Sequence, residues 1–341
     1  MFSQKPNVAI VGSTGAVGQA MVAILEQREF PVGTLYPLAS ERSAGKTVMF
    51  RNKAVSVALL ESFDFSDVEV AFFSAGASVS AKHAARAVAS GCVVIDNTSH
   101  FRNDPAIPLV VPEVNPSALS SHAGIIANPN CSTIQMVVAL KPIYDAVGIT
   151  RINVCTYQAV SGAGNKAMEE LAGQTAALLN GRPVEAKVMP KQIAFNAIPH
   201  IDSFQENGYT REEMKMVWET RKILEDQTIG VNPTTVRVPV FYGHSEAIHV
   251  ETREKISAQQ ARKLLGAAPG VTVVDERVDG GYPTAVTEAT DADPVFVGRI
   301  REDISCEKGL CLWVVSDNIR KGAALNSIQI AEHLLTQEGP A

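Results

Sequence analysis

The stretch "VAIVGSTGAVG", residues 8 to 18, decides the fold of the first part of the chain. Asn7–Val11 reads as a buried strand, and a helical pattern follows over Ala16–Arg28. A glycine-rich turn between a strand and a helix lets backbone N–H groups approach a pyrophosphate, which the helix N-terminus favours. The spacing is G-x-x-G-x-x-G, a departure from G-x-G-x-x-G, so a tight strand–helix turn without a ligand also fits.

The same alternation continues to about residue 130. Further apolar strands are expected at Gly33–Leu38, Val68–Ser74, Cys92–Asp96 and Gly124–Asn128, with an alanine-rich helix at Val79–Ala89. Continuous apolar strands separated by helices indicate a parallel sheet that is covered on both faces. The first part of the chain is therefore predicted to be an α/β, Rossmann-type doubly wound domain.

From about residue 151 the pattern changes. Longer, often alternating strands are expected at Ile152–Ala159, Thr234–Phe241, Glu246–Glu254 and Gly309–Ser316, with amphipathic helices at Lys166–Leu179 and Arg211–Asp226. This style is typical of an antiparallel sheet with one covered face. We expect a second, α+β domain with a largely antiparallel sheet over 131–321. A helix within 322–341 is expected to pack back onto domain 1–130.

Composition limits the possible functions. The chain has 341 residues, 46% of them hydrophobic, a net charge of −6 and five cysteines. Neither a basic surface for nucleic acid nor a membrane segment is indicated. The odd number of cysteines, without a C-x-x-C pair, argues against a disulfide framework and a zinc site, so no metal is expected. The start of the sequence lacks a signal peptide, and a cytoplasmic location is expected.

The end of the second strand bears on the choice of cofactor. Glu41, Arg42 and Ser43 follow Leu38-Ala39-Ser40. An acidic residue here would hold a ribose 2′-hydroxyl, whereas Arg42 with Ser43 would hold a 2′-phosphate. The sequence favours NADP, although Glu41 keeps NAD open and Arg42 is also compatible with an ordinary solvated loop charge.

A second stretch, "NPNCSTIQ" at residues 128 to 135, places Cys131 at the junction of a strand and a helix. The helix dipole and the free N–H groups of a first turn favour a thiolate there, although a buried structural cysteine also fits. The other four, Cys92, Cys155, Cys306 and Cys311, are predicted to be structural.

A thiolate on a nicotinamide fold suggests oxidation or reduction of an aldehyde through a thioester. Such a site needs a general acid/base near the sulfur. His244 is expected in a turn between two strands and His249 within the second of them. The residues alone leave the choice among the histidines open.

Six segments together resemble the aspartate-β-semialdehyde dehydrogenase family. They are "GSTGAVG", "NPNCSTIQ", "QAVSGAG", "EEMKMVWETRKIL", "VRVPVFYGHSEAIHVE" and "SDNIRKGAALN", in the family's order and over nearly the whole chain. The resemblance implies reversible, NADPH-dependent reduction of β-aspartyl phosphate to aspartate semialdehyde, with release of phosphate. It also implies a homodimer, and a place in lysine, threonine, methionine and diaminopimelate biosynthesis.

The resemblance also implies roles for individual residues. Cys131 would be the nucleophile that forms the acyl-thioester, His244 the general acid/base, and Gln158 the group that orients the thioester carbonyl. The implied substrate contacts are Arg237 with the α-carboxylate, Glu212 with the ammonium, Asn130 beside the thiol, and Arg102 with Lys215 at the phosphate. The implied cofactor contacts are Gly12, Ser13, Thr14, Gly15, Ala16, Val17, Arg42 and Ser43, with Ser161, Gly162 and Asn318 at the nicotinamide.

Simpler interpretations remain for four of these residues. Gln158 is also compatible with a solvent-facing strand position, and Arg237 with an exposed strand arginine. Glu212 and Lys215 have the spacing of an i,i+3 surface ion pair.

Three other functions compete with the implied one. An N-acetyl-γ-glutamyl-phosphate reductase would share the phosphate loop, the cysteine and the histidine. Its cysteine, however, typically lies between Gly and Tyr-Pro, whereas Cys131 lies between Asn130 and Ser132. The signature of glyceraldehyde-phosphate dehydrogenases is absent. A non-catalytic nucleotide-binding paralogue would have no need to keep Cys131, Gln158, Arg237 and His244 together.

Overall fold

The computed structural model describes residues 3–337, and the chain forms two compact units. The first contains the residues up to Asn130 and those from Ala323 onward, whereas the second is the continuous segment Cys131–Gly322. None of the helices within 3–337 combines the length and the apolar character that crossing a bilayer requires.

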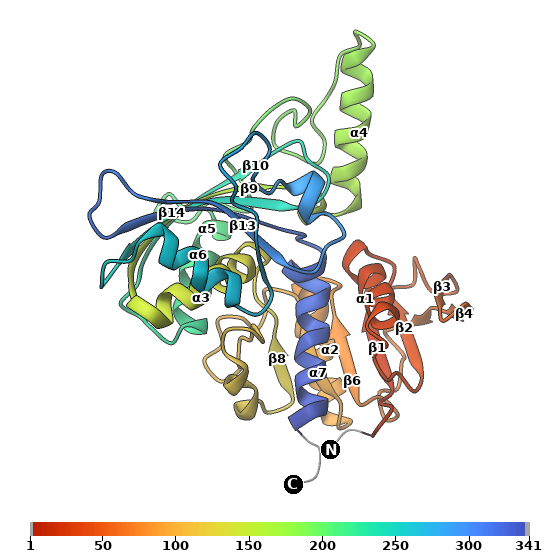
Figure 1. Ribbon diagram of the computed structural model, residues 1–341. Coiled ribbons are helices and arrows are strands. Elements are labelled where there is room, and N and C mark those ends of the chain that lie inside the picture. Colours follow the sequence, from red (N-terminus) through yellow and green to blue (C-terminus); the bar gives the residue numbers. More distant parts are fainter. Residues whose placement is uncertain (1–2, 338–341) are drawn as a thin grey trace. The chain divides into compact units, whose positions relative to one another are not determined.

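The first unit is built on a sheet of six parallel strands in the order β5-β2-β1-β6-β7-β8 (Figure 1). The strands are β1 (Val8–Val11), β2 (Leu35–Ala39), β5 (Ala58–Leu59), β6 (Val70–Phe73), β7 (Val93–Asp96) and β8 (Ile125–Ala127). The chain passes from β1 outward to β2 and later returns to the other side of β1 with β6. In such sheets, ligands bind where the order reverses, beyond the carboxyl ends of the strands. The predicted parallel sheet is confirmed.

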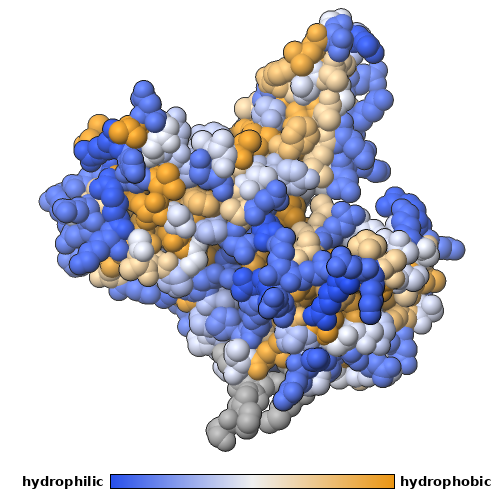
Figure 2. Space-filling view, turned by 45° about the vertical axis from the view of Figure 1, so that its right-hand side comes forward, coloured by the Kyte–Doolittle hydropathy of each residue, from blue (hydrophilic) through white to orange (hydrophobic). Residues whose placement is uncertain are grey.

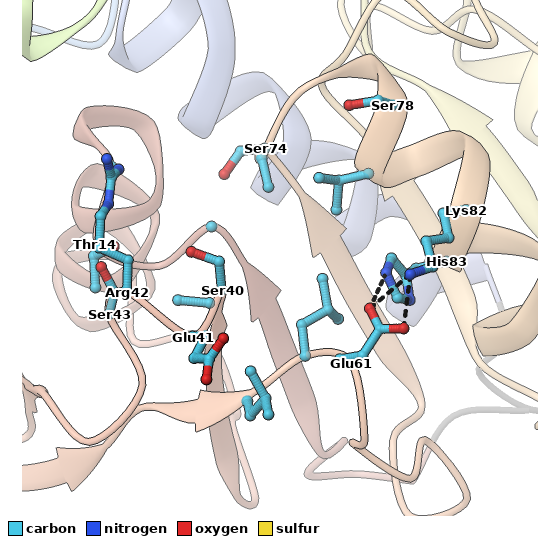
Figure 3. A pocket seen from close by; sticks show the side chains of 17 residues that line it. Thr14, Ser40, Glu41, Arg42, Ser43, Glu61, Ser74, Ser78, Lys82 and His83 are labelled. Atoms are coloured by element: carbon cyan, nitrogen blue, oxygen red, sulfur yellow. Dashed lines mark hydrogen bonds and ion pairs between the residues drawn. The ribbon is translucent and has the colours of Figure 1, made fainter.

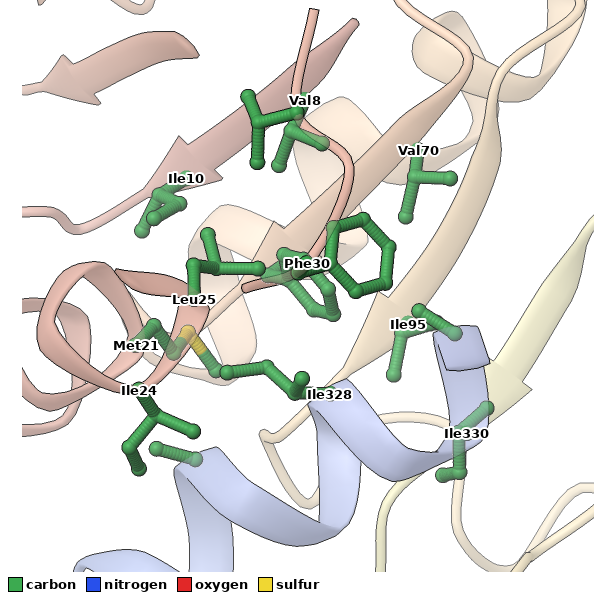
Figure 4. Packing of buried hydrophobic residues seen from close by; sticks show 14 of the residues in the cluster. Val8, Ile10, Met21, Ile24, Leu25, Phe30, Val70, Ile95, Ile328 and Ile330 are labelled. Carbon is green, nitrogen blue, oxygen red and sulfur yellow. The ribbon is translucent and has the colours of Figure 1, made fainter. Parts of the chain in front are cut away.

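Helices cover both faces of this sheet. Successive residues of a strand point to opposite faces, so each strand contributes side chains to two cores. Val8 and Ile10 enter one hydrophobic core with α1 (Ala16–Gln27) and α7 (Leu325–Gln337), as Figure 4 shows. Ala9 and Val11 enter a second core beneath α2 (Ala77–Ala89).

Helix α7 brings the end of the chain back to the first unit. It follows a π-helical turn, η4 (Arg320–Ala324), and its Ile328 packs into the same core as Met21 and Leu25 of α1. At the rim, Arg28 donates two hydrogen bonds of 2.7 Å to Glu332. Helix α7 therefore belongs to the first unit.

A small hairpin in the first unit was not predicted. Strands β3 (Thr47–Phe50) and β4 (Lys53–Ser56) join through Arg51 and Asn52, which both have positive φ angles, 50° and 60°. Such a two-residue turn is usually signalled by Asn-Gly or Asp-Gly. Arg-Asn lacks that signal, and the strands are largely exposed, so no alternating apolar pattern marks them.

The second unit contains a six-stranded mixed sheet in the order β10-β9-β11-β14-β13-β12. Its strands are β9 (Ile149–Gln158), β10 (Gly230–Arg237), β11 (His244–Thr252), β12 (Val271–Val273), β13 (Val295–Glu302) and β14 (Gly309–Ser316). The three central pairings are antiparallel, and β10 and β12 at the edges run parallel to their neighbours. The predicted α+β unit is confirmed.

Helices α3 (Cys131–Val147), α5 (Arg211–Ile223) and α6 (Ala258–Ala267) pack on one face of this sheet. Helix α4 (Asn165–Leu179) instead projects from the sheet and packs its buried residues against the segment 189–198 (Figure 1). Figure 2 shows hydrophobic and hydrophilic side chains on opposite sides of this projection. Two short turns complete the unit, η2 (Val160–Ala163) and η3 (Ala285–Ala289).

Two predicted boundaries in the second unit are wrong. The strand expected at Thr234–Phe241 lies earlier, as β10, and ends at Arg237, because Pro239 lacks the N–H that a continuing ladder requires. His244, expected in a turn, is the first residue of β11 and pairs with Ser316 of β14. The difference matters, because a strand residue is held more rigidly than a turn residue.

Candidate active site

A cavity of about 770 Å³ lies beyond the carboxyl ends of β1, β2 and β6 in the first unit (Figure 3). Gly12, Thr14 and Gly15 of the glycine-rich turn line it, and so do Glu41, Arg42 and Ser43 after β2. Three other predicted cofactor residues do not line it. Ser13 is buried and donates a 3.3 Å hydrogen bond to the Leu38 carbonyl, Ala16 opens α1, and Val17 packs against the hydrophobic core.

The turn fits a pyrophosphate. A Cβ on Gly18 would lie 2.3 Å from the Gly12 carbonyl oxygen, so only glycine allows the turn to close this tightly. Gly15 is the N-cap of α1 and offers no side chain to the first-turn N–H groups. An anion beyond the helix N-terminus can therefore take those N–H groups as donors.

The cavity also has a charged wall that the sequence did not reveal. Lys82 Nζ lies 2.7 Å from a Glu61 carboxylate oxygen, and His83 Nε2 lies 3.5 Å from the other. These residues come from α2 and from the segment after β5. Because they are some twenty residues apart and belong to no motif, no pattern in the sequence points to them.

In the second unit, Cys131 is the first residue of α3 and is half-buried. It therefore lies at the positive end of the helix dipole, which favours the thiolate. Gly322 closes over it, since a Cβ there would lie 2.8 Å from Cys131 Cβ. The predicted position of Cys131 at a helix start is confirmed, while its predicted catalytic role is not tested by its place in the fold.

His244 is fully buried, and its ring orientation is fixed by one hydrogen bond. The Ala159 N–H donates to Nδ1 at 3.1 Å, so the neutral ring carries its proton on Nε2. Within residues 3–337, Nε2 has no hydrogen-bond partner. Burial, and then the charge of Arg237, lower the pKa of His244 to about 3. The imidazole is therefore neutral at physiological pH.

Arg237 lies beside His244, and the side chains of both residues face Gly162. Its Nη1 donates a 2.7 Å hydrogen bond to the Ala159 carbonyl, the same peptide segment that holds His244. A Cβ on Gly162 would lie 3.0 Å from Arg237 Nη1 and 3.4 Å from His244 Nε2. Arg237 is only 6% exposed, so the alternative of an exposed strand arginine is wrong. Burial lowers the pKa of Arg237, and the negative charges of Glu212 and Cys131 oppose this effect.

Gln158, Glu212 and Lys215 form a continuous polar chain. Gln158 Nε2 donates to Glu212 Oε1 at 3.3 Å, and Lys215 Nζ lies 2.9 Å from Glu212 Oε2 and 2.8 Å from Asp202 Oδ2. Gln158 is 1% exposed, so a solvent-facing glutamine is also wrong. The Glu212–Lys215 ion pair exists but is mostly buried. Burial lowers the pKa of Lys215, yet the two carboxylates outweigh it and the net pKa is raised.

Ser161 and Asn318 support the segment before His244. Asn318 Oδ1 accepts a 2.9 Å hydrogen bond from the Gly243 N–H, and Asn318 Nδ2 donates to Ser161 Oγ at 2.9 Å. Ser161 and Gly162 both lie in η2. These three predicted nicotinamide residues are therefore brought together beside the histidine.

Two residues that are predicted to contact the substrate or phosphate belong to the first unit. Arg102 follows β7, is mostly buried and donates a 2.7 Å hydrogen bond to the Asn97 carbonyl. Asn130 is buried and directly precedes Cys131. Lys215 belongs to the second unit, so joint binding of one phosphate by Arg102 and Lys215 stays a prediction.

Sequence reasoning missed a buried acid two residues after His244. Glu246 is fully buried, and within residues 3–337 neither carboxyl oxygen has a hydrogen-bond partner. Burial raises the pKa of Glu246 well above its usual value, an effect that nearby Gln135 only partly opposes. Gln135 Nε2 in turn lies 3.5 Å from the His244 carbonyl oxygen. The signal available was a glutamate at an inward position of an alternating strand.

Two family models match the chain. Residues 7–122 match the NAD binding domain of semialdehyde dehydrogenases, and residues 140–321 match the dimerisation domain of the same enzymes.

Named relatives cover nearly all of the chain. An aspartate-semialdehyde dehydrogenase of Legionella pneumophila is 64% identical over 335 residues, which cover 98% of this chain and 96% of the relative. The Bacillus subtilis enzyme is 52% identical over 336 residues, covering 96% and 97%.

Solved structures agree with these relatives. Aspartate semialdehyde dehydrogenase II of Vibrio cholerae, complexed with ASA, superposes with a TM-score of 0.97 at 60% identity, covering 99% of this chain and 100% of that one. The Candida albicans enzyme with NADP gives a TM-score of 0.77 at 26% identity, covering 97% and 98%. The chain is an oxidoreductase and belongs to the aspartate-semialdehyde dehydrogenase family.

Proposed function

We propose that the protein catalyses the reversible reduction of β-aspartyl phosphate by NADPH, giving aspartate semialdehyde and phosphate, in the cytoplasm. The products would feed lysine, threonine, methionine and diaminopimelate synthesis. One observation carries the proposal: His244 Nε2 and Arg237 Nη1 both face Gly162, in the same unit as Cys131 at the start of α3. A proton-bearing ring nitrogen and a carboxylate-binding fork thus lie side by side in the unit that carries the nucleophile.

Cys131 is the proposed covalent centre. In the oxidative direction its thiolate adds to the aldehyde carbonyl, and loss of hydride leaves an acyl-thioester. A phosphate oxygen then attacks the thioester carbonyl, and the thiolate leaves as the acyl phosphate forms. The cofactor, when bound, accepts the hydride in this direction and supplies it in the other.

His244 is the proposed acid/base. Because Nδ1 accepts the Ala159 N–H, the resting ring presents Nε2–H, which suits hydrogen bonding to the oxygen that gains charge in the tetrahedral adduct. For Nε2 to accept a proton, Nδ1 must take one itself and lose that hydrogen bond. The geometry of the resting ring therefore favours the donor role.

The buried charges suit an amino-acid substrate. Arg237 would pair with the α-carboxylate through its planar fork, and Glu212 with the ammonium. Gln158, hydrogen-bonded to Glu212, would orient the thioester carbonyl, with Asn130 beside the thiol. Arg102 and Lys215 would bind the phosphate, which at Lys215 would compete with Asp202.

The cofactor proposal is NADP. The turn Gly12–Gly15 and the start of α1 would hold the pyrophosphate, Arg42 with Ser43 the 2′-phosphate, and Ser161, Gly162 and Asn318 the nicotinamide. The exposed Arg42 lies at the cavity rim within reach of a ligand, and the structure of the Candida albicans relative is one with NADP. A homodimer is proposed from the match to a dimerisation domain.

The decisive experiment traps the covalent intermediate. The wild-type protein, incubated with aspartate semialdehyde and NADP without phosphate, should show one acyl adduct by mass spectrometry, on the peptide that contains Cys131. Cys131→Ser should bind NADP normally but form no adduct and lose nearly all turnover, because a serine alkoxide is much harder to generate. Cys155→Ser is the matched control and should retain the adduct. An adduct on any other cysteine would contradict the proposed mechanism.

A further inference from the structure

One cluster of potential metal ligands lies on the sheet of the second unit, away from the helices that cover its other face. Among the described residues, His249, Asp303 and Cys311 form the one group of three whose ligand atoms all lie within 4.8 Å of one another. His249 is exposed, Asp303 is half-buried and Cys311 is buried. None of the three takes part in the proposed reaction.

Three neighbouring strands position the cluster. His249 of β11 pairs directly with Cys311 of β14, so their side chains lie on the same face. Asp303 directly follows β13, and its N–H donates to the Gly309 carbonyl at the start of β14. Because Gly309 and Cys311 are two residues apart on one strand, Asp303 is a diagonal neighbour of Cys311. Ligands held by paired strands need little ordering when they bind an ion.

The spacing of two of the three ligands matches that of two ligands around one ion. His249 Nδ1 lies 3.2 Å from Cys311 Sγ. Two ligands of a tetrahedral zinc ion, at roughly 2.0 Å for nitrogen and 2.3 Å for sulfur, are separated by a similar distance. Ser305 holds Asp303 Oδ1 with hydrogen bonds of 2.6 and 2.8 Å, which fixes the carboxylate and leaves Oδ2 for an ion.

A metal requires thiolate, neutral imidazole and ionised carboxylate. A bound divalent ion would supply the thiolate by displacing the thiol proton of Cys311.

We propose that His249, Asp303 and Cys311 form a binding site for a borderline-soft divalent cation of the zinc type, with a fourth position open to water. One nitrogen, one sulfur and one oxygen ligand exclude magnesium and calcium, which prefer oxygen alone. The site would tie β11, β14 and β13 together at one end of the sheet. It requires nothing of the proposed catalytic cysteine and histidine.

Cobalt(II) is the appropriate probe, because it occupies zinc sites and its bond to a thiolate gives a charge-transfer absorption band. The titration uses the full-length Cys131→Ser protein, which removes the thiol at the proposed reaction centre. About one Co²⁺ per chain should bind and produce the thiolate band together with the visible absorption of a tetrahedral ion. Absence of the thiolate band at saturating Co²⁺ would overturn the proposal.

Second-site variants in the Cys131→Ser background locate the ligand. Cys311→Ser should abolish the thiolate band, whereas Cys155→Ser, the matched control in the neighbouring strand β9, should leave it intact. His249→Ala changes an exposed residue, so it should fold normally and weaken Co²⁺ binding by about tenfold or more. A thiolate band that persists in Cys311→Ser, or unchanged affinity in His249→Ala, would assign the ion elsewhere and refute the site.

Discussion

At the scale of single residues, the charge of the buried Arg237 influences the protonation of the buried His244. The charge of Arg237 is the second cause, after desolvation, that lowers the pKa of His244 to about 3. If a substrate carboxylate pairs with Arg237, that charge is offset, and the pKa of His244 should rise toward its ordinary value. The His244 ring would then accept a proton more readily in the substrate complex than in the free protein.

Replacing His244 tests its role. His244→Asn keeps a side chain of similar shape but removes the acid/base, so kcat should fall by roughly 10²–10⁴-fold while the KM values change much less. Initial rates with aspartate semialdehyde, NADP and phosphate measure both constants. His249→Asn, on the outward face of the same strand, is the matched control and should leave kcat nearly unchanged. The reverse pattern would assign the catalytic role to His249.

Glu246 makes a prediction about stability and pH. Its pKa is raised in the folded protein, so between about pH 4.5 and the folded pKa the native state binds more protons than the unfolded state. Its stabilising contribution is therefore complete below pH 4.5 and is lost as the pH rises. Glu246→Gln, which has no such titration, should become more stable than the wild type by up to roughly 1.4 kcal/mol per pH unit across this window.

Urea unfolding at a series of pH values measures this difference. Both tryptophans, Trp218 and Trp313, belong to the second unit, as Glu246 does, so their fluorescence reports the unfolding of that unit. Glu254→Gln removes the same charge from an exposed position and serves as the control. A pH-independent difference between Glu246→Gln and the wild type would mean that Glu246 is ionised in the folded protein.

At the scale of elements, α7 is the helix whose packing can be tested most cleanly. Ile328 is fully buried in the core shared with α1, and Ile328→Ala should lower the free energy of unfolding of the first unit by about 2–5 kcal/mol. Hydrogen exchange of the β1 amides measures this, because the tryptophans report the other unit. Thr336→Ala, exposed on the same helix, should change stability by no more than about 0.5 kcal/mol. Equal effects of the two substitutions would exclude a core role for this face of α7.

The elements also show what could be predicted from sequence and why. Strands such as β1 and β14, and helices such as α1 and α4, have an apolar pattern with one clear period, and their predicted spans agree closely with the structure. The hairpin β3–β4 is mostly exposed, with Phe50 as its buried residue, so it carries little apolar pattern, and its turn uses Arg51 and Asn52. Strand β10 was displaced because Pro233 lies inside it, a position that usually argues against a strand.

Residues of the candidate site could be predicted from sequence where they belong to a motif of several functional residues. Cys131 and His244 stand in such motifs. The fold joins Gln158 to Glu212 by a hydrogen bond and binds Arg237 to the same residue, Ala159, that holds His244. Glu246 was missed because a lone glutamate in a strand carries no chemical signature in sequence. Its burial results from the pairing of β11 with β9 and β14, which only the folded sheet reveals.

At the scale of the whole molecule, the first unit is formed by two separate segments of the chain and the second unit by one continuous segment. Residues up to Asn130 supply the parallel sheet, and the chain from Ala323 onward supplies α7. The core facing α7 takes six buried residues from that last segment: Ala324, Leu325, Ile328, Ile330, Ala331 and Leu334. The first unit therefore lacks part of one core until the end of the chain arrives.

This division has a consequence during synthesis on the ribosome. At 5–20 residues per second, the stretch Cys131–Gly322 takes roughly 10–40 s to make, and throughout that time one face of the first sheet has α1 but lacks α7. The second unit, being continuous, can close as soon as it emerges. The nascent chain should thus expose Ile95 and Leu119, over which α7 packs, as a target for holding chaperones, and nucleotide-binding competence should appear only after α7 has left the exit tunnel.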